Sequence, residues 1–180
     1  SNRIPFIWTD EHTAAFDLIK KDMLSTNGLK HFNPDLPLYL SSDASQTRCG
    51  SVLYQLNRNI WEPIGYFSRV FTAAEQRASS RHRELYALVY AIRNFEYYLI
   101  GRKFVSVVDH KSLLYLFEEH MKTKLNNRLV NCFVYLQSFD MSLIHKPGES
   151  PEMASADALS RMPVTNFELM EAEAQRDAIP

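Results

Sequence analysis

Three strand-like runs with short connections occupy the first half of the chain, and they limit the possible folds more than any other feature. They are "PLYLSSD" (37–43), "CGSVLYQL" (49–56) and "WEPIGYFSRV" (61–70). Strands joined by such short connections run antiparallel. Two further runs, 103–111 and 140–146, are each reached across a helical segment, so we expect them to pair in parallel. The sequence therefore predicts an α/β protein with a mixed five-stranded sheet, its first three strands antiparallel, flanked by helices.

Helical patterns separate and flank these strands. Apolar residues recur at helical spacing over residues 9–26, 72–99, 112–120, 126–139 and 155–162. Thr72 and Glu75 form a capping-box pattern, and Ser155 is expected to cap the last helix. The expected order of elements is α-βββ-α-β-α-α-β-α.

The chain divides by composition into three parts. Residues 1–34 hold a helix and a linker, residues 35–163 the sheet with its helices, and residues 164–180 an acidic tail that we expect to be flexible or weakly helical. The net charge is −1, and without the tail there remain 19 basic and 17 acidic residues, a net of +2. This is not the strongly basic balance of a tight nucleic-acid binder. If nucleic acid binds, metal ions and a local basic strip must attract it.

The hydrophobic fraction of 46% and the aromatic fraction of 12% suit a protein with a real core. No apolar run reaches the roughly 18 residues that a membrane span requires, and we expect neither a membrane segment nor a secretory leader. Cys49 and Cys132 lack metal-ligand spacing, so they are interpreted as core residues in a reducing compartment.

Four acidic residues occupy positions where a core element would normally be apolar or would end. Asp43 and Asp109 end strands, Glu84 lies on the apolar stripe of the helix over 72–99, and Asp157 lies in the first turn of the last helix. Each has an ordinary alternative explanation. Asp43 can cap a turn, and Glu84 can turn toward solvent or pair with Arg81. Asp109 can cap the following helix, and Asp157 can offset the helix dipole.

Considered together, the four acids favour a metal site. If the sheet brings these carboxylates to one edge, their mutual repulsion requires a counter-charge. Oxygen ligands without a histidine or cysteine cluster suit a hard cation such as Mg²⁺ or Mn²⁺. Two such ions about 4 Å apart support in-line phosphoryl transfer.

The motifs around these acids carry a family resemblance. "SSDAS", "CGSVLYQ", "REL", "VDHKSL" and "ADALSR" follow one another in this order between about residue 5 and residue 163. They resemble the RNase H domain of gypsy-type LTR retrotransposon polyproteins. The opening segment, "PFIWTDEHTAAFDLIKKDMLS", resembles the stretch that joins reverse transcriptase to RNase H in such polyproteins.

The resemblance implies an RNase H-like fold and a nuclease that cuts the RNA strand of an RNA–DNA hybrid, leaving 3′-hydroxyl and 5′-phosphate ends. The family's metal-binding and catalytic acids fall on Asp43, Glu84, Asp109 and Asp157, and two Mg²⁺ ions are the implied cofactors. The implied partners are the hybrid and the reverse transcriptase domain of the same polyprotein. The implied location is the cytoplasmic retrotransposon particle or the nucleus.

Polar and basic residues beside the acids are the candidate substrate contacts. The RNA strand is expected to be recognised through its 2′-hydroxyl groups, and Asn126, Asn127 and Arg128 are expected to meet the phosphates of the DNA strand. The remaining candidates are Ser45, Gln46, Arg48, Arg81, His110 and Lys111.

Many RNases H place a mobile histidine in the loop before the last aspartate, where it assists product departure. Here that loop is "HKPGESPEMASAD", and it is longer than the family's usual pattern. His145 lies twelve residues before Asp157, directly after an apolar strand. It is either the product-release residue or, as its position favours, a strand-end residue.

Two other functions remain open at this point. The chain could be a catalytically silent or domesticated module that serves as a protein or nucleic-acid scaffold, although all four acids are intact. A DDE-type integrase or transposase nuclease shares the fold, but it has no counterpart of Glu84 in the helix after the third strand.

Overall fold

The structure is a computed structural model that describes residues 8–24, 28–111, 113–115 and 127–174. The chain forms two units, residues 1–30 and residues 31–180. The first contains helix α1 (Asp10–Leu24), close to the predicted bounds. The paragraphs below concern the second unit.

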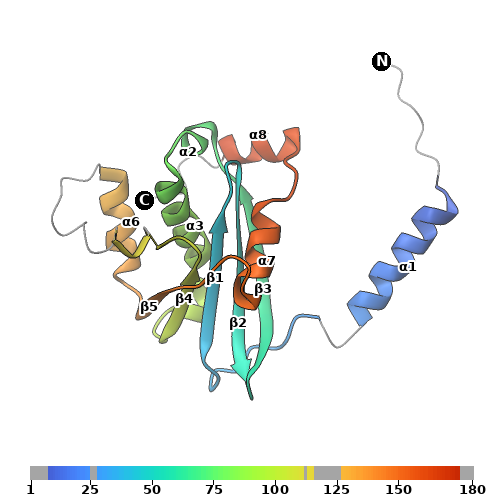
Figure 1. Ribbon diagram of the computed structural model, residues 1–180, viewed down its shortest axis with the longest axis horizontal. Helices are drawn as coiled ribbons and strands as arrows, with labels where there is room; N and C mark the ends of the chain where they lie inside the picture. Colours follow the sequence, from blue (N-terminus) through green and yellow to red (C-terminus); the bar gives the residue numbers. More distant parts are fainter. Residues whose placement is uncertain (1–7, 25–27, 112, 116–126, 175–180) are drawn as a thin grey trace. The chain divides into compact units, whose positions relative to one another are not determined.

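A five-stranded sheet in the order β3-β2-β1-β4-β5 forms the second unit's centre (Figure 1). Its strands are β1 (Leu38–Ala44), β2 (Arg48–Asn57), β3 (Ile60–Val70), β4 (Phe104–Val108) and β5 (Met141–His145). The pairs β1–β2 and β2–β3 are antiparallel, and the pairs β1–β4 and β4–β5 are parallel. The predicted mixed sheet is therefore confirmed.

The described helices of this unit lie between and after the strands. They are α2 (Ala73–Gln76), α3 (Ser80–Asn94), α4 (Glu96–Leu99), α6 (Asn127–Leu136), α7 (Pro151–Ser160) and α8 (Asn166–Ala174). Most of the helix predicted over 112–120 lies outside the described residues.

Two helix predictions need correction. The segment predicted as one helix over 72–99 is broken, because the Ser79 hydroxyl accepts a hydrogen bond from the His82 amide and starts α3 as a new helix. The last helix begins at Pro151 rather than Ser155, with proline in the first turn, where its missing N–H is not needed. Asp157 therefore lies in the second half of α7, and a role in offsetting the dipole at the helix start is wrong.

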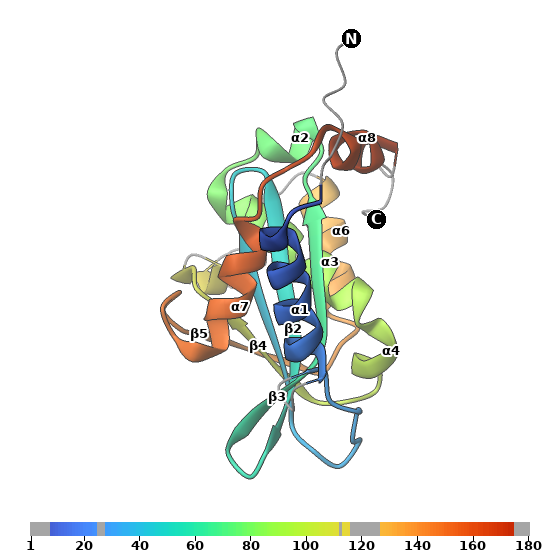
Figure 2. The ribbon, with the colours of Figure 1, turned by 90° about the vertical axis from the view of Figure 1, so that its right-hand side faces the viewer.

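The sheet is covered on both faces. Leu38 and Leu40 of β1 belong to the large core that includes the buried face of α3. The alternate residue Tyr39 packs instead with Met153 and Ala156 of α7. Because successive side chains of a strand point to opposite faces, α3 and α7 cover opposite faces of the sheet (Figures 1 and 2).

Part of the acidic C-terminal segment is helical, which is one of the two alternatives expected for it. Residues 166–174 form α8, Ala172 is buried, and Glu168 makes an ion pair of 2.7 Å with Arg48 of β2. In both views α8 lies at the end of the sheet near α2 (Figures 1 and 2). None of the described helices is long and apolar enough to cross a membrane.

Helix α7 approaches β2 so closely that only glycine fits at residue 50. A Cβ atom on Gly50 would lie 2.4 Å from the Ala156 main-chain oxygen and 2.6 Å from the Ser160 main-chain nitrogen. Main-chain atoms cannot move aside as a flexible side chain can, so this contact fixes the distance between α7 and the sheet.

We expect Gly50→Ala to lower the free energy of unfolding by about 3 kcal/mol, at the upper end of the usual cost of overpacking, because α7 must move as a whole. Urea unfolding followed by circular dichroism measures this cost. Gly65→Ala is the comparison, because its added Cβ would meet the Phe95 ring, at 2.7 Å, rather than main chain. A Gly50→Ala protein no less stable than Gly65→Ala would contradict this explanation.

Candidate metal centre

Three of the four predicted acids come together at one end of the sheet. Asp43 of β1, Glu84 of α3 and Asp109, the residue after β4, each offer a carboxylate oxygen, and these three atoms all lie within 4.8 Å of one another. Asp43 and Glu84 are buried, and Asp109 is half-buried. Three carboxylates at this distance form a site of strongly negative potential.

The strand order explains how residues 66 positions apart meet. β1 and β4 run parallel side by side, and Ser42 is paired with Val108. Asp43 and Asp109 are each the next residue along, so both lie at the carboxyl ends of adjacent parallel strands. Ligand sites in open α/β sheets are typically found at this edge.

Helix α3 supplies the third carboxylate from above the sheet. Leu88 and Ile92, which continue the Glu84 face of the helix, are fully buried. Glu84 itself is only 4% exposed. The alternative in which Glu84 turns toward solvent is therefore wrong.

Burial and mutual repulsion favour protonated carboxyl groups here. Burial, followed by the charges of Asp43 and Asp109, raises the pKa of Glu84 to about 9. The pKa of Asp43 is also raised, chiefly by burial, although a hydrogen bond from Ser160 opposes this effect. The charge of Arg83 lowers the pKa of Glu84, but burial and the repulsion from Asp43 and Asp109 outweigh it.

A hard divalent cation fits this group of residues. All three candidate ligands are carboxylates, which suit Mg²⁺ or Mn²⁺. The buried Oε2 atom of Glu84 has no hydrogen-bond partner among the described residues. A buried carboxylate oxygen without a donor is costly, and a bound cation would satisfy it.

Asp157 lies near this group but is paired differently. Its Oδ1 atom accepts a hydrogen bond of 2.6 Å from Nε of Arg161 and lies 2.5 Å from Nη2. Its charge still contributes to the raised pKa of Asp43. The role of Asp157 as the fourth metal ligand stays a prediction.

Two residues of the "ADALSR" motif have contacts at the centre that the sequence analysis missed. The buried Ser160 hydroxyl donates a hydrogen bond to Oδ2 of Asp43, and Arg161 holds Asp157. Helical spacing was the available signal, because residues three and four positions after Asp157 share its side of a helix.

A hollow of about 380 Å³ opens at the three carboxylates. Ser45, Gln46 and His110 line it, together with Arg161. The exposed Lys111 follows directly, and Arg81 is half-buried in the first turn of α3. These residues surround the centre, and their contact with substrate stays a prediction.

Two of the candidates for the DNA strand lie in or beside α6. Asn127 is exposed, whereas Arg128 pairs with the fully buried Glu75 at 2.7 Å and lies over the Tyr86 ring. Any phosphate at Arg128 would have to share it with Glu75. Asn126 lies outside the described residues.

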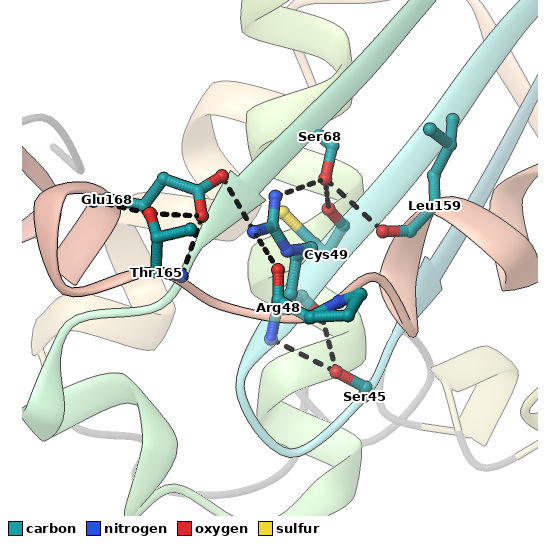
Figure 3. Close-up of polar contacts among 8 residues, drawn as sticks. Ser45, Arg48, Cys49, Ser68, Leu159, Thr165 and Glu168 are labelled. Atoms are coloured by element: carbon teal, nitrogen blue, oxygen red, sulfur yellow. Dashed lines mark hydrogen bonds and ion pairs between the residues drawn. The ribbon is translucent and has the colours of Figure 1, made fainter. Parts of the chain in front are cut away.

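The structure does not support Arg48 as a substrate contact. It is 4% exposed, and its guanidinium donates to Ser68, to the Pro163 main-chain oxygen and to Glu168 (Figure 3). Arg48 is thus an internal residue, and it cannot reach a substrate in this arrangement. A basic side chain next to an acid motif looks the same in sequence whether it points outward or inward.

His145 is the last residue of β5. Its Nε2 atom lies 2.9 Å from the Asp109 main-chain oxygen. This contact supports the strand-end interpretation, and the product-release role stays untested.

The fold and the site together define the class of protein. A mixed sheet in this order, with carboxylates at the ends of β1 and β4 and on α3, is an RNase H-like architecture. A foamy virus protease-reverse transcriptase, solved in complex with an RNA/DNA hybrid, matches with a TM-score of 0.58 and 20% identity, over 88% of this chain and 21% of that one. LC11-RNase H1, also solved with an RNA/DNA hybrid, matches with a TM-score of 0.51 and 15% identity, over 76% of this chain and 99% of that one.

The chain belongs to the family of RNase H-like domains found in reverse transcriptase, whose model matches residues 8–106. The Pol polyprotein of transposon 412 of Drosophila melanogaster is 31% identical over 161 residues, 89% of this chain and 13% of the relative. The transposon Tf2-3 polyprotein of Schizosaccharomyces pombe is 29% identical over 158 residues, which are 86% of this chain and 12% of the relative. The chain thus spans about an eighth of the length of these relatives, and the predicted family is confirmed.

The raised pKa of Glu84 predicts how the metal-free protein responds to pH. The folded state keeps this proton up to a pKa of about 9, whereas the unfolded chain loses it near 4.5. The unfolded state therefore binds fewer protons between these values, and stability must fall as pH rises through that window.

We expect Glu84→Gln to weaken this pH dependence and to raise the melting temperature at pH 8 in EDTA by at least ~3 °C. One pKa unit is about 1.4 kcal/mol, and 1 kcal/mol shifts a domain of this size by about 2–4 °C. Thermal unfolding from pH 5 to pH 9 measures both effects. The matched control is Glu96→Gln on α4, which is exposed. Equal pH dependence in wild type and Glu84→Gln would contradict the electrostatic account.

Proposed function

We propose that this chain is a metal-dependent endoribonuclease that hydrolyses the RNA strand of RNA–DNA hybrids. The observation that carries the proposal is the cluster of three carboxylates from β1, α3 and the end of β4. The relatives of this chain are transposon polyproteins. This supports a role during reverse transcription, beside the reverse transcriptase domain of the same polyprotein.

The chemistry would require Mg²⁺ or Mn²⁺ at the cluster. Asp43, Glu84 and Asp109 would hold the ions, with Asp157 as the expected fourth ligand. Bound in a pair, such ions activate a water molecule and stabilise the leaving oxygen. The water oxygen bonds to phosphorus, the bond from phosphorus to the 3′-oxygen breaks, and a proton passes to that oxygen. The products are a 3′-hydroxyl and a 5′-phosphate.

The protein's own residues would orient the substrate and the ligands. The Ser160 hydroxyl fixes one oxygen of Asp43, which leaves the other available for the centre. Ser45, Gln46 and His110 line the hollow, where they could bind 2′-hydroxyl groups that distinguish RNA from DNA. Because the chain has a net charge of −1, the bound ions would supply much of the attraction for phosphates.

We expect Asp43→Asn to lower cleavage of a labelled hybrid by more than ~100-fold, because loss of a ligand should cost more than the 10–100-fold typical of residues that only orient ligands. Its melting temperature in EDTA should equal or exceed that of the wild type, since one of several like charges is removed. Duplex RNA and duplex DNA test specificity, and Asp140→Asn, an exposed aspartate, is the control. Cleavage at the wild-type rate would mean that Asp43 only shapes a turn, and a wild type that cuts no hybrid would favour a scaffold function.

We expect His145→Ala to change steady-state turnover by less than ~3-fold, about 0.65 kcal/mol on the transition-state scale. Its ring contacts the Asp109 main chain at the end of β5, as expected for a strand-end residue. Turnover is measured with hybrid in excess at fixed Mg²⁺, beside a single-turnover burst and Asp157→Asn as the inactive control. A ten-fold loss confined to the steady state would assign His145 to product release, because release can limit turnover while chemistry is intact.

A further inference from the structure

Arg48 connects three segments that are far apart in the sequence. Its Nη1 atom donates to the Ser68 hydroxyl at 3.1 Å, and its Nη2 atom donates to the Pro163 main-chain oxygen at 3.1 Å and to Oε1 of Glu168 at 2.7 Å (Figure 3). These four residues form what we call the Arg48 cluster. Because a buried guanidinium needs a counter-charge, Glu168 of the C-terminal helix is required for Arg48 to lie here.

Glu168 is held in turn by the start of α8. Its Oε2 atom accepts hydrogen bonds of 2.9 Å from both the amide and the hydroxyl of Thr165, and the Glu168 amide donates back to that hydroxyl at 3.3 Å. This is a capping box, encoded by "TNFE" at 165–168. The Thr165 amide and Arg48 hold the pKa of Glu168 down at about 2. One carboxylate oxygen thus caps the helix while the other pairs with Arg48.

The same cluster contacts the end of α7. The Ser68 hydroxyl lies 3.3 Å from the Leu159 main-chain oxygen and 3.1 Å from that of Cys49 (Figure 3). Leu159 directly precedes Ser160, whose hydroxyl donates to Asp43. Asp157 lies two residues before Leu159. The residues of α7 that face the metal centre therefore have the Arg48 cluster directly behind them.

Arg48 also closes the turn that follows Asp43. Its main-chain oxygen accepts a hydrogen bond of 2.9 Å from the Ser45 amide, and its amide donates to the Ser45 hydroxyl at 3.1 Å. Arg48 thus contacts the Asp43 turn through its main chain, and its side chain is linked to the end of α7 through the Ser68 hydroxyl.

From these contacts we propose that Arg48 and Glu168 are positioning residues, which hold Asp157 and Ser160 of α7 in place at the metal centre. Through Glu168, the acidic C-terminal segment then helps to position the residues of α7 at the metal centre. The catalytic consequence rests on the proposed function, whereas the structural consequence does not.

The test compares Glu168→Gln with Glu171→Gln. Both remove one charge from α8, and both residues line the same 220 Å³ pocket beside Arg48. Of these two glutamates, only Glu168 forms an ion pair with Arg48 among the described contacts. Thr165→Val is a third variant, which keeps the charge of Glu168 and removes the two hydrogen bonds that the Thr165 hydroxyl makes with it.

Three measurements are made well below the melting temperature of each variant. In Glu168→Gln we expect amide hydrogen exchange of residues 156–163 to be at least ~5-fold faster in the metal-free protein. Mn²⁺ affinity by calorimetry and turnover on hybrid should each fall ~3- to 10-fold, at or below the range for residues that orient metal ligands. Glu171→Gln should stay within ~2-fold of wild type, and Thr165→Val should lie between the two.

Two results would overturn the proposal. The first is unchanged exchange over 156–163 with unchanged Mn²⁺ affinity in Glu168→Gln. The second is faster exchange spread evenly over the sheet, which would mean that the ion pair only adds to global stability. A wild type that binds Mn²⁺ but cuts no hybrid would reject the nuclease function, while the exchange comparison would still decide the role of the Arg48 cluster.

Discussion

The parallel pairing of β1 with β4 is the constraint on which the site depends. Parallel neighbours end at the same edge, so the pairing of Ser42 with Val108 brings Asp43 and Asp109 together although 65 residues lie between them. The connection between these strands includes α3, and a helix on this connection packs onto the sheet close to the same edge. A carboxylate oxygen of Glu84 then lies within 4.8 Å of one on each aspartate.

Such a cluster opposes folding in the absence of cations. Burial and repulsion both favour the neutral acids, as the raised pKa values of Asp43 and Glu84 indicate. The cost is offset by the two apolar cores on either face of the sheet and by the Ser160 hydrogen bond to Asp43. A metal that binds only the folded state would recover this free energy as stability. Affinity for the metal and repulsion without it therefore have one physical origin.

Several arginines of this domain serve its interior rather than its surface. Arg48 holds the C-terminal segment, Arg128 neutralises the buried Glu75, and Arg83 donates to main-chain oxygens of Ser45 and Ala78. These guanidinium groups carry positive charge without offering it freely to a phosphate backbone. The near-neutral balance of the whole chain thus overstates the basic charge available to a nucleic acid, and under the proposed function a larger share of the attraction would fall to metal ions.

The sequence by itself determined the order of the strands and pointed to the three acids that the structure brings together, because both depend on local patterns. Strand alternation, short connections and capping residues act within a few positions of one another, and each acid stands at an end or on a stripe that is visible in the sequence. The motifs from "SSDAS" to "ADALSR" identified the family. Even so, a second helix start at Ser79 and the capping box at Thr165 are local signals that the sequence analysis passed over.

Only the tertiary structure decided which way the side chains around the acids point. Arg48 and Gln46 stand two residues apart beside the same aspartate, yet one is buried against α8 and the other lines the hollow. Gly50 likewise sets how close α7 can lie to the sheet. The Arg48–Glu168 ion pair and the contact of Gly50 with α7 each join segments more than 100 residues apart in the chain. Periodicity and composition carry no information about contacts at that separation, since packing between distant elements alone selects the partners.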